Sequence, residues 1–234
     1  NPVEQVLVDD RLVLTGVNIG TYNWQEHCIV DVIDALGAIE GLRRIRISSI
    51  EPTTIPGELF DRMADESHPL LPYLHVPVQS GSDSVLSRMR RKYSRGQFLE
   101  IVRAAADRVP GIGIGTDALV GMPGETDEDF AQTCNLIEHG PIDYVHVFKY
   151  SEREGTASAR MADQVPGDVK LRRSAVLRRL SAEKQRRQAL RHLGEAHDVL
   201  FEHPADGCWT GYTGNYIRVS VRSGAILKNR IAPV

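Results

Sequence analysis

The stretch Ile112-Gly-Ile-Gly-Thr-Asp-Ala-Leu-Val120 decides the fold class of this chain. Apolar side chains alternate along it, as in a strand whose successive side chains point to opposite faces. A helix is expected next, at about residues 126–139, and then a second strand at 143–149. This strand–helix–strand order predicts a βαβ unit with two parallel strands.

The same order extends toward the N-terminus. Strands are expected at 12–16, 43–48 and 73–78, and helices at about 26–40, 56–66, 83–91 and 94–108. The fold class is therefore α/β. A closed or partial (β/α) barrel fits better than a doubly wound sheet, because polar residues follow every strand rather than one switch point. A short helix at residues 2–10 would run directly into a strand at 11–15, and the missing turn suggests that residues are absent at this junction.

Strand parity predicts a polar barrel interior. The apolar residues of each strand must face the surrounding helices, which leaves the opposite set for the lumen. That set is largely polar and comprises Arg46, Ser48, His75, Gln79, Asp117, His146 and Tyr150. Buried polar groups are costly unless they pair with one another or with a ligand. Internal pairing explains any one of them, but seven together favour a site for a polar cofactor.

Composition sets limits on the function. The 234 residues carry a net charge of -3, so the whole molecule is not a generic polyanion binder, and an RNA surface must be a local patch. No apolar run is long enough to cross a bilayer. The cysteines, Cys28, Cys134 and Cys208, are few and far apart, which suits a reducing cytoplasm and gives no spacing typical of a metal site.

The C-terminal third differs in composition. Residues 166–193 predict a strongly basic helix, and the sequence after Gly194 is rich in Gly, Thr, aromatic and β-branched residues, as in a small all-β domain. The predicted domains are 1–165, 166–194 and 195–234. The helix is suited to neutralising phosphates, or it is a solvated helix whose apolar residues Leu171, Val176, Leu177 and Leu180 dock on the barrel. The two interpretations are compatible.

Three blocks of sequence carry a family resemblance. They are His75-Val-Pro-Val-Gln-Ser-Gly-Ser-Asp83 with its continuation Arg88-Met-Arg-Arg-Lys-Tyr93, then Thr116-Asp-Ala-Leu-Val-Gly-Met-Pro-Gly-Glu-Thr126, and Tyr150-Ser-Glu-Arg-Glu-Gly-Thr-Ala157. In this order they resemble the conserved blocks of the methylthiotransferase branch of the radical S-adenosylmethionine enzymes. The resemblance covers nearly the whole chain.

Further stretches point to one subfamily. They are Leu14-Thr-Gly-Val-Asn-Ile-Gly20, Arg46-Ile-Ser-Ser-Ile-Glu-Pro52 and Gly211-Tyr-Thr-Gly-Asn-Tyr216. These resemble the bacterial enzymes that methylthiolate threonylcarbamoyl-adenosine beside the tRNA anticodon. The resemblance also implies that the C-terminal part is a partial TRAM domain, a small β-barrel that binds RNA.

The resemblance implies a set of site residues. Those expected to bind S-adenosylmethionine are Gly16, Asn18, Ser48, Gln79, Ser80, Ser82, Asp117, Gly121, Gly124 and Glu125. An ordinary turn, with Glu125 and Thr126 capping the next helix, is the alternative for the last three. Those expected on the substrate or RNA side are Tyr150, Ser151, Arg153, Arg172, Arg173, Arg179, Tyr212 and Tyr216. Aromatic rings stack on bases, although filling a small core is the alternative use for the tyrosines.

The implied reaction needs metal centres. In the family, a 4Fe–4S cluster on a CxxxCxxC loop cleaves S-adenosylmethionine to a radical, a second cluster delivers sulfur, and a second S-adenosylmethionine supplies the methyl group. Neither set of cluster cysteines is in this sequence, and Cys28 and Cys134 fall on predicted helices. We therefore expect no metal site and no activity from this chain alone.

Three other functions compete with this hypothesis. An RNA-binding fragment with a purely structural barrel would bind tRNA without affinity for S-adenosylmethionine. A methylthiotransferase of the isopentenyl-adenosine branch would differ in its substrate. An aldolase-like Schiff-base barrel is disfavoured because Lys149, the one lysine on a predicted strand, shares the parity of Val145 and Val147 and so faces away from the lumen.

Overall fold

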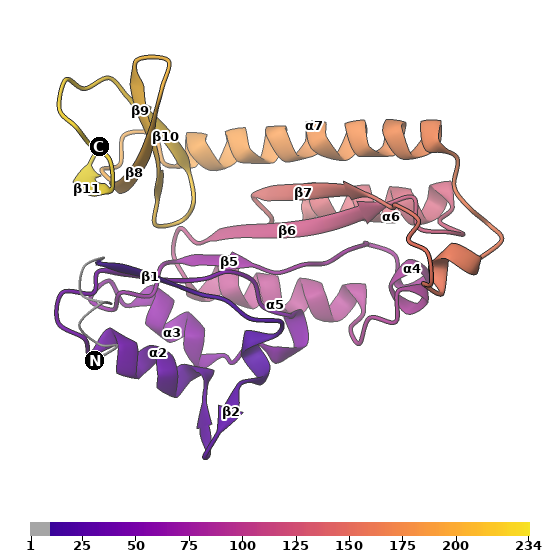
Figure 1. Cartoon of the computed structure of the whole chain (residues 1–234), viewed down its shortest axis with the longest axis horizontal. Coiled ribbons are helices and arrows are strands. Elements are labelled where there is room, and N and C mark those ends of the chain that lie inside the picture. The colour runs from indigo at the N-terminus through magenta and orange to yellow at the C-terminus, as the bar shows by residue number, and fades with distance from the viewer. Residues whose placement is uncertain (1–9) are drawn as a thin grey trace.

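A computed structural model describes residues 10–234, so the helix expected at 2–10 lies almost wholly outside the described residues. The expected alternation is present from there on (Figure 1). The strands are β1 (Arg11–Leu14), β4 (Arg44–Ile47), β5 (Tyr73–His75), β6 (Gly113–Val120) and β7 (Tyr144–Lys149). The helices between them are α2 (Ile29–Gly37), α3 (Glu58–Ala64), α4 (Asp83–Arg88), α5 (Arg95–Arg108) and α6 (Asp127–His139). Short 3-10 turns occur at Ile19–Thr21, Pro52–Thr54 and Ser158–Arg160.

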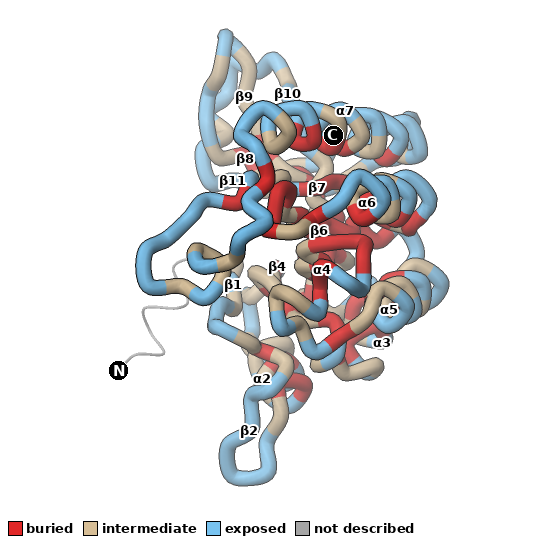
Figure 2. Tube along the Cα trace, turned by 90° about the vertical axis from the view of Figure 1, so that its right-hand side faces the viewer, coloured by how far each residue is buried: buried red, intermediate tan, exposed pale blue. Residues whose placement is uncertain are grey.

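The five strands run parallel. β1 pairs with β4, and β5, β6 and β7 form a second sheet in that order. Backbone hydrogen bonds join the sheets, from Ile45 N to Pro69 O at 2.7 Å, from Leu71 N to Ile45 O at 2.9 Å and from Ile50 N to His75 O at 3.0 Å. The strands therefore follow one another as β1-β4-β5-β6-β7, with helices along the outside and buried residues gathered between the layers (Figure 2). This arrangement is a mixed α/β fold of the predicted parallel type.

The predicted apolar parity is confirmed by burial. The outward-facing strand residues are at most 1% exposed and pack against the helices: Ile45, Ile47, Leu74, Val76, Val78, Ile114, Ala118 and Val120. Because a strand alternates strictly, burying this set against the helices turns its neighbours toward the inner face. The core therefore fixes which side chains line the interior.

One hairpin was not expected from the sequence. Strands β2 (Asn23–Trp24) and β3 (His27–Cys28) pair antiparallel, and the two residues of the turn, Gln25 and Glu26, both have positive φ, at 47° and 69°. Cys28 thus ends a strand and precedes α2, so its predicted helical position was wrong. Strands of two residues are too short for a period-two pattern to be visible in sequence.

The predicted basic helix is α7 (Gly167–Arg191), which lies along β7 and β6 (Figure 1). Two residues of α7 face these strands: Leu177 is fully buried, and the Ser181 hydroxyl accepts a hydrogen bond from Val145 N of β7 at 2.9 Å. Leu171 is 58% exposed, so its predicted docking on the barrel was wrong. Within residues 10–234, no helix combines the length and the apolar character that a bilayer span requires.

The C-terminal segment forms a four-stranded antiparallel sheet in the order β10-β9-β8-β11. Its strands are β8 (Asp198–Ala205), β9 (Cys208–Thr213), β10 (Arg218–Val221) and β11 (Arg230–Pro233). The sheet docks at the N-terminal ends of the parallel strands, where Arg44 donates to Asp198 O at 2.6 Å. A Cβ on Gly113 would lie 2.0 Å from Asn215 O, so only glycine permits this approach.

Candidate functional site

The inner faces of the strands bring polar side chains together, as predicted. His75 Nε2 lies 2.9 Å from Asp117 Oδ1, and His75 Nδ1 lies 3.2 Å from the Tyr144 hydroxyl. The hydroxyls of Tyr144 and Tyr73 hydrogen-bond to each other, and the ring centroids of His146 and His75 are 5.5 Å apart. This cluster, which we call the lumen cluster, satisfies much of its own hydrogen-bonding capacity.

Burial disfavours ionisation of three members of the lumen cluster, Tyr73, Tyr144 and His146. It raises the pKa of Tyr73 to about 12 and raises that of Tyr144 as well, so both phenols stay protonated. Burial and the neighbouring His75 lower the pKa of His146. The Arg46 guanidinium stacks over the rings of Tyr73 and Tyr216 at 4.9 and 4.1 Å from their centroids. The interior is thus an aromatic and hydrogen-bonding environment suited to a polar, planar ligand.

A glycine loop follows β6 at the opposite end of the strands. Gly121 and Gly124 both have positive φ, at 80° and 75°, which favours glycine. Glu125 Oε2 accepts hydrogen bonds from Gly121 N and from Arg173 Nη1, each at 2.6 Å, and Arg173 Nη2 donates to Asp127 at 2.7 Å. Burial raises the pKa of the Glu125 carboxyl. α7 therefore clamps the loop through a buried ion pair.

The alternative interpretation of this loop as a capped turn holds in part. Thr126 does cap α6, because its hydroxyl accepts from Asp129 N at 3.1 Å. Glu125 instead turns back to the Gly121 amide. Its second carboxylate oxygen is buried without a hydrogen-bond partner among the described residues, as is the Tyr150 hydroxyl.

A comparison with protein-family models matches residues 12–137 to the radical SAM superfamily. The chain belongs to this superfamily. The match runs from β1 into α6 and covers slightly more than half of the sequence, so it includes the glycine loop and most of the lumen cluster.

Curated relatives of this radical SAM chain are tRNA methylthiotransferases. The threonylcarbamoyladenosine tRNA methylthiotransferase MtaB of Bacillus subtilis (strain 168) is 36% identical over an alignment 241 residues long. The alignment covers 98% of this chain and 53% of the relative. The tRNA-2-methylthio-N(6)-dimethylallyladenosine synthase of Tropheryma whipplei (strain Twist) is 41% identical over 162 residues, covering 68% of this chain and 34% of the relative. The chain thus spans about half the length, or less, of these relatives.

A solved structure supports the fold. The archaeal Methanocaldococcus infernus Elp3 with an N-terminal deletion has a TM-score of 0.50 at 12% identity, over 96% of this chain and 73% of that one. At this identity the likeness concerns architecture alone. The C-terminal four-stranded sheet and the parallel strands therefore form a mixed α/β molecule of a known structural type.

The residues present fit part of what a radical SAM enzyme binds. The aliphatic part of the Lys170 side chain lies against the Gly121 backbone, where a Cβ would come within 2.4 Å of it, so this backbone is approached as closely as only glycine allows. Gln79 has a φ of 64°, a left-handed conformation that is strained for a side-chain-bearing residue and is typical of functional sites. These features suit an adenosyl group lying along the backbone. In contrast, no cysteine takes part in a metal-ligand cluster within residues 10–234, so the described residues do not fit an iron–sulfur cluster.

The structure places the predicted cofactor residues unevenly. Ser80 and Ser82 are buried, and their hydroxyls bond to Thr133 at 3.2 Å and to Asp129 at 2.5 Å. They orient the β5–α4 connection from within, so neither hydroxyl is directed at open space. The other members near this end are exposed or half-buried: Gly16, Asn18, Ser48 and Gln79.

The predicted RNA-side residues are split between the two ends of the parallel strands. Tyr150 is buried beside Met122, while Ser151 and Arg153 after it are exposed. Arg173 is buried in the ion pair, so its guanidinium serves the glycine loop, whereas Arg172 and Arg179 remain exposed. Tyr212 and Tyr216 lie at the other end of the strands. The two ends are about 26 Å apart, which is the length of the eight-residue strand β6 at the usual rise per residue.

The sequence interpretation missed two features. The partnership of Arg173 with Glu125 joins residues 48 positions apart, and no spacing rule predicts it. The cluster of Tyr73 and Tyr144 was visible in part, because both share strand parity with His75 and His146. Their contact with Tyr216 depends on how the C-terminal sheet docks, which no local pattern encodes.

Proposed function

We propose that the protein containing this chain methylthiolates threonylcarbamoyl-adenosine beside the anticodon of tRNA. In this proposal residues 1–165 cradle S-adenosylmethionine, α7 within 166–194 lies along the RNA, and 195–234 are a TRAM-like RNA-binding part. The observation that carries it is the similarity to the Bacillus subtilis relative, which runs through 98% of the chain and so includes the barrel, α7 and the C-terminal sheet.

The residues of this chain would prepare the cofactor rather than generate the radical. S-adenosylmethionine supplies the reactive adenosyl and methyl groups when bound. The Gly121 and Gly124 backbone offers a surface for adenine, and Asn18, Gln79 and Ser48 lie near the same end with side chains suited to ribose and carboxylate groups. The Glu125–Arg173 pair holds that loop in shape. The proposed setting for this chemistry is cytoplasmic.

Nucleoside analysis of tRNA tests the proposal. The complete gene that encodes this chain would be expressed in a strain that lacks methylthiotransferases, and its tRNA digested and separated by liquid chromatography with mass spectrometry. We expect a methylthio group on threonylcarbamoyl-adenosine. Its absence from every adenosine derivative would refute the proposal.

A second candidate is the dimethylallyl-adenosine branch. It is favoured by a higher identity, 41%, over a shorter part of the chain. The same experiment separates the two, because the methylthio group would then appear on dimethylallyl-adenosine. Equilibrium dialysis of this chain with labelled S-adenosylmethionine separates both from a purely structural RNA-binding fragment, which would show no uptake.

A further inference from the structure

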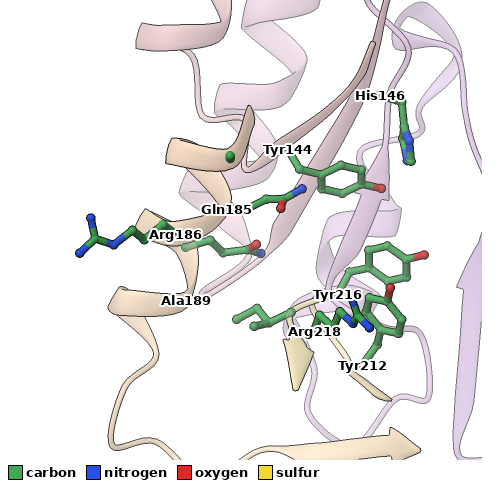
Figure 3. Close-up of a pocket in the computed structure, with 11 residues that line it drawn as sticks. Tyr144, His146, Gln185, Arg186, Ala189, Tyr212, Tyr216 and Arg218 are labelled. Carbon is green, nitrogen blue, oxygen red and sulfur yellow. The ribbon is translucent and has the colours of Figure 1, made fainter. Parts of the chain in front are cut away.

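A cavity of about 500 Å³ lies between α7 and the C-terminal sheet. We call it the tyrosine pocket, and Figure 3 shows the side chains that line it. Aromatic residues form one side, and α7 forms the other with Gln185, Arg186, Ala182 and Ala189. The aromatic and imidazole members are Tyr144, His146, Tyr212 and Tyr216, and Arg218 completes the rim.

The rings of the pocket are held in place from behind. Tyr212 and Tyr216 stack with centroids 4.6 Å apart and planes 15° apart. Tyr216 in turn packs 4.7 Å from Tyr73, with Arg46 stacked over its face. A ring fixed in this way loses little conformational freedom when a ligand stacks on it, which favours recognition of flat aromatic groups.

The polar groups of the pocket remain available. Gln185 points toward Tyr144 (Figure 3) and makes no hydrogen bond within residues 10–234, so its amide offers both a donor and an acceptor. The Arg218 guanidinium lies beside the Tyr216 ring, whereas Arg186 points away from the rings toward solvent. The lining contains no carboxylate. An aromatic face, a free amide and the Arg218 cation beside the rings together match a nucleotide, with its flat base and anionic phosphate.

The pocket lies apart from the cofactor loop. Arg186 and Arg173 are both on α7, and the thirteen helical steps from one to the other span about 20 Å. Exposed arginines lie on α7 between these points, including Arg178 and Arg179. A strand of RNA along the helix would therefore present one nucleotide to the pocket and a different one to the glycine loop.

We propose that the tyrosine pocket binds one unstacked nucleobase of the RNA substrate, at a position other than the nucleotide that is modified. The inference rests on the proposed function, because it takes RNA as the ligand. It goes further by assigning a base-binding site, with Tyr212 stacking on the base, Tyr216 supporting Tyr212 from behind, Gln185 bonding the base edge and Arg218 contacting phosphate.

An abasic scan tests this assignment. A fluorescent single-stranded RNA with an anticodon-loop sequence, and a set in which each position in turn lacks its base, would be titrated with this chain by fluorescence anisotropy. We expect one position whose base loss weakens binding by roughly 5- to 100-fold, as for a stacked base. The Tyr212→Leu variant should bind the intact RNA more weakly by a similar factor, and its affinity should not change when the base at that position is removed. Tyr212→Phe should bind as the parent does.

Two surface variants keep the test independent of folding. Gln185→Ala and Arg218→Ala change exposed positions at the pocket and should weaken binding of the intact RNA. Arg103→Ala, which changes an exposed arginine on α5, should leave that binding unchanged. If the RNA binds but no base position is coupled to Tyr212, Gln185 or Arg218, the pocket assignment is overturned while RNA binding stands. If no RNA binds at micromolar protein, the assignment fails together with the RNA-binding part of the proposed function.

Discussion

Replacing Arg173 with methionine should destabilise the chain strongly. The side chains of Arg173 and Glu125 are 7% and 1% exposed, so the change leaves a buried carboxylate without its cation. Removing one member of such a pair costs about 3–5 kcal/mol in the free energy of unfolding. The second ion pair adds little, because the Asp127 side chain is 97% exposed and exposed pairs contribute about 0–1 kcal/mol. For a chain of this size the midpoint of thermal unfolding should fall by about 6–20 °C.

Urea unfolding followed by circular dichroism measures the effect, and Arg172→Met is the matched control. Arg172 is the neighbouring arginine on α7, and its pair with Asp168 is about two-thirds exposed on both sides, so its loss should be barely measurable. Adding Glu125→Gln to Arg173→Met should restore part of the stability, because the amide no longer buries a charge. Hydrogen exchange at the Gly121 amide, which bonds to Glu125, should speed up in the single variant. A loss below about 1 kcal/mol in Arg173→Met would refute the clamp.

Two further results are expected. Gly113→Ala should loosen the C-terminal sheet, since the new Cβ would lie 2.0 Å from Asn215 O, whereas Gly224→Ala has open space; limited proteolysis should cleave only the first variant faster. Burial opposes ionisation of Asp129, but hydrogen bonds, led by the one from Ser82, outweigh it and lower its pKa. The ionised Asp129 side chain should stabilise the folded chain fully above the ordinary carboxyl pKa of about 3.9. This stabilisation should be lost as the pH falls through the lower pKa that Asp129 has in the folded chain. Urea unfolding between pH 3 and 7 should therefore show less acid sensitivity in Asp129→Asn, and equal sensitivity would disprove this role.

Much of the architecture was predictable because it is encoded locally. Alternating apolar residues in β4, β5 and β6 identified both the strands and their buried faces, and the polar lumen followed from parity alone. The β2–β3 hairpin was missed because its two-residue strands carry no periodicity. Some strands are also shorter than predicted. The strand expected at 73–78 is β5, which ends at His75, and the chain beyond it pairs with β6 again only through an isolated bridge between Gln79 and Ala118.

The candidate site was predictable only in part. Sequence motifs identified the residues around the glycine loop, but they could not say which hydroxyls are free. Ser80 and Ser82 illustrate the limit, because their partners Thr133 and Asp129 come from α6, about fifty residues away. Tyr212 and Tyr216 were expected near RNA, yet their position at the end of the parallel strands opposite the glycine loop depends on the docking of the C-terminal sheet. Tertiary contacts of this kind are absent from any single stretch of sequence.

The ring stack at the N-terminal ends of the parallel strands has an evolutionary consequence. Tyr73 and Tyr144 come from the parallel strands and Tyr216 from the C-terminal sheet, yet they pack as one core with Arg46. The two parts therefore cannot be exchanged between homologues as independent modules. A recombinant that joins these parallel strands to a foreign C-terminal sheet would keep Arg46, Tyr73 and Tyr144 but lose the Tyr216 ring that packs on them. Lineages should retain the four side chains together or replace them together.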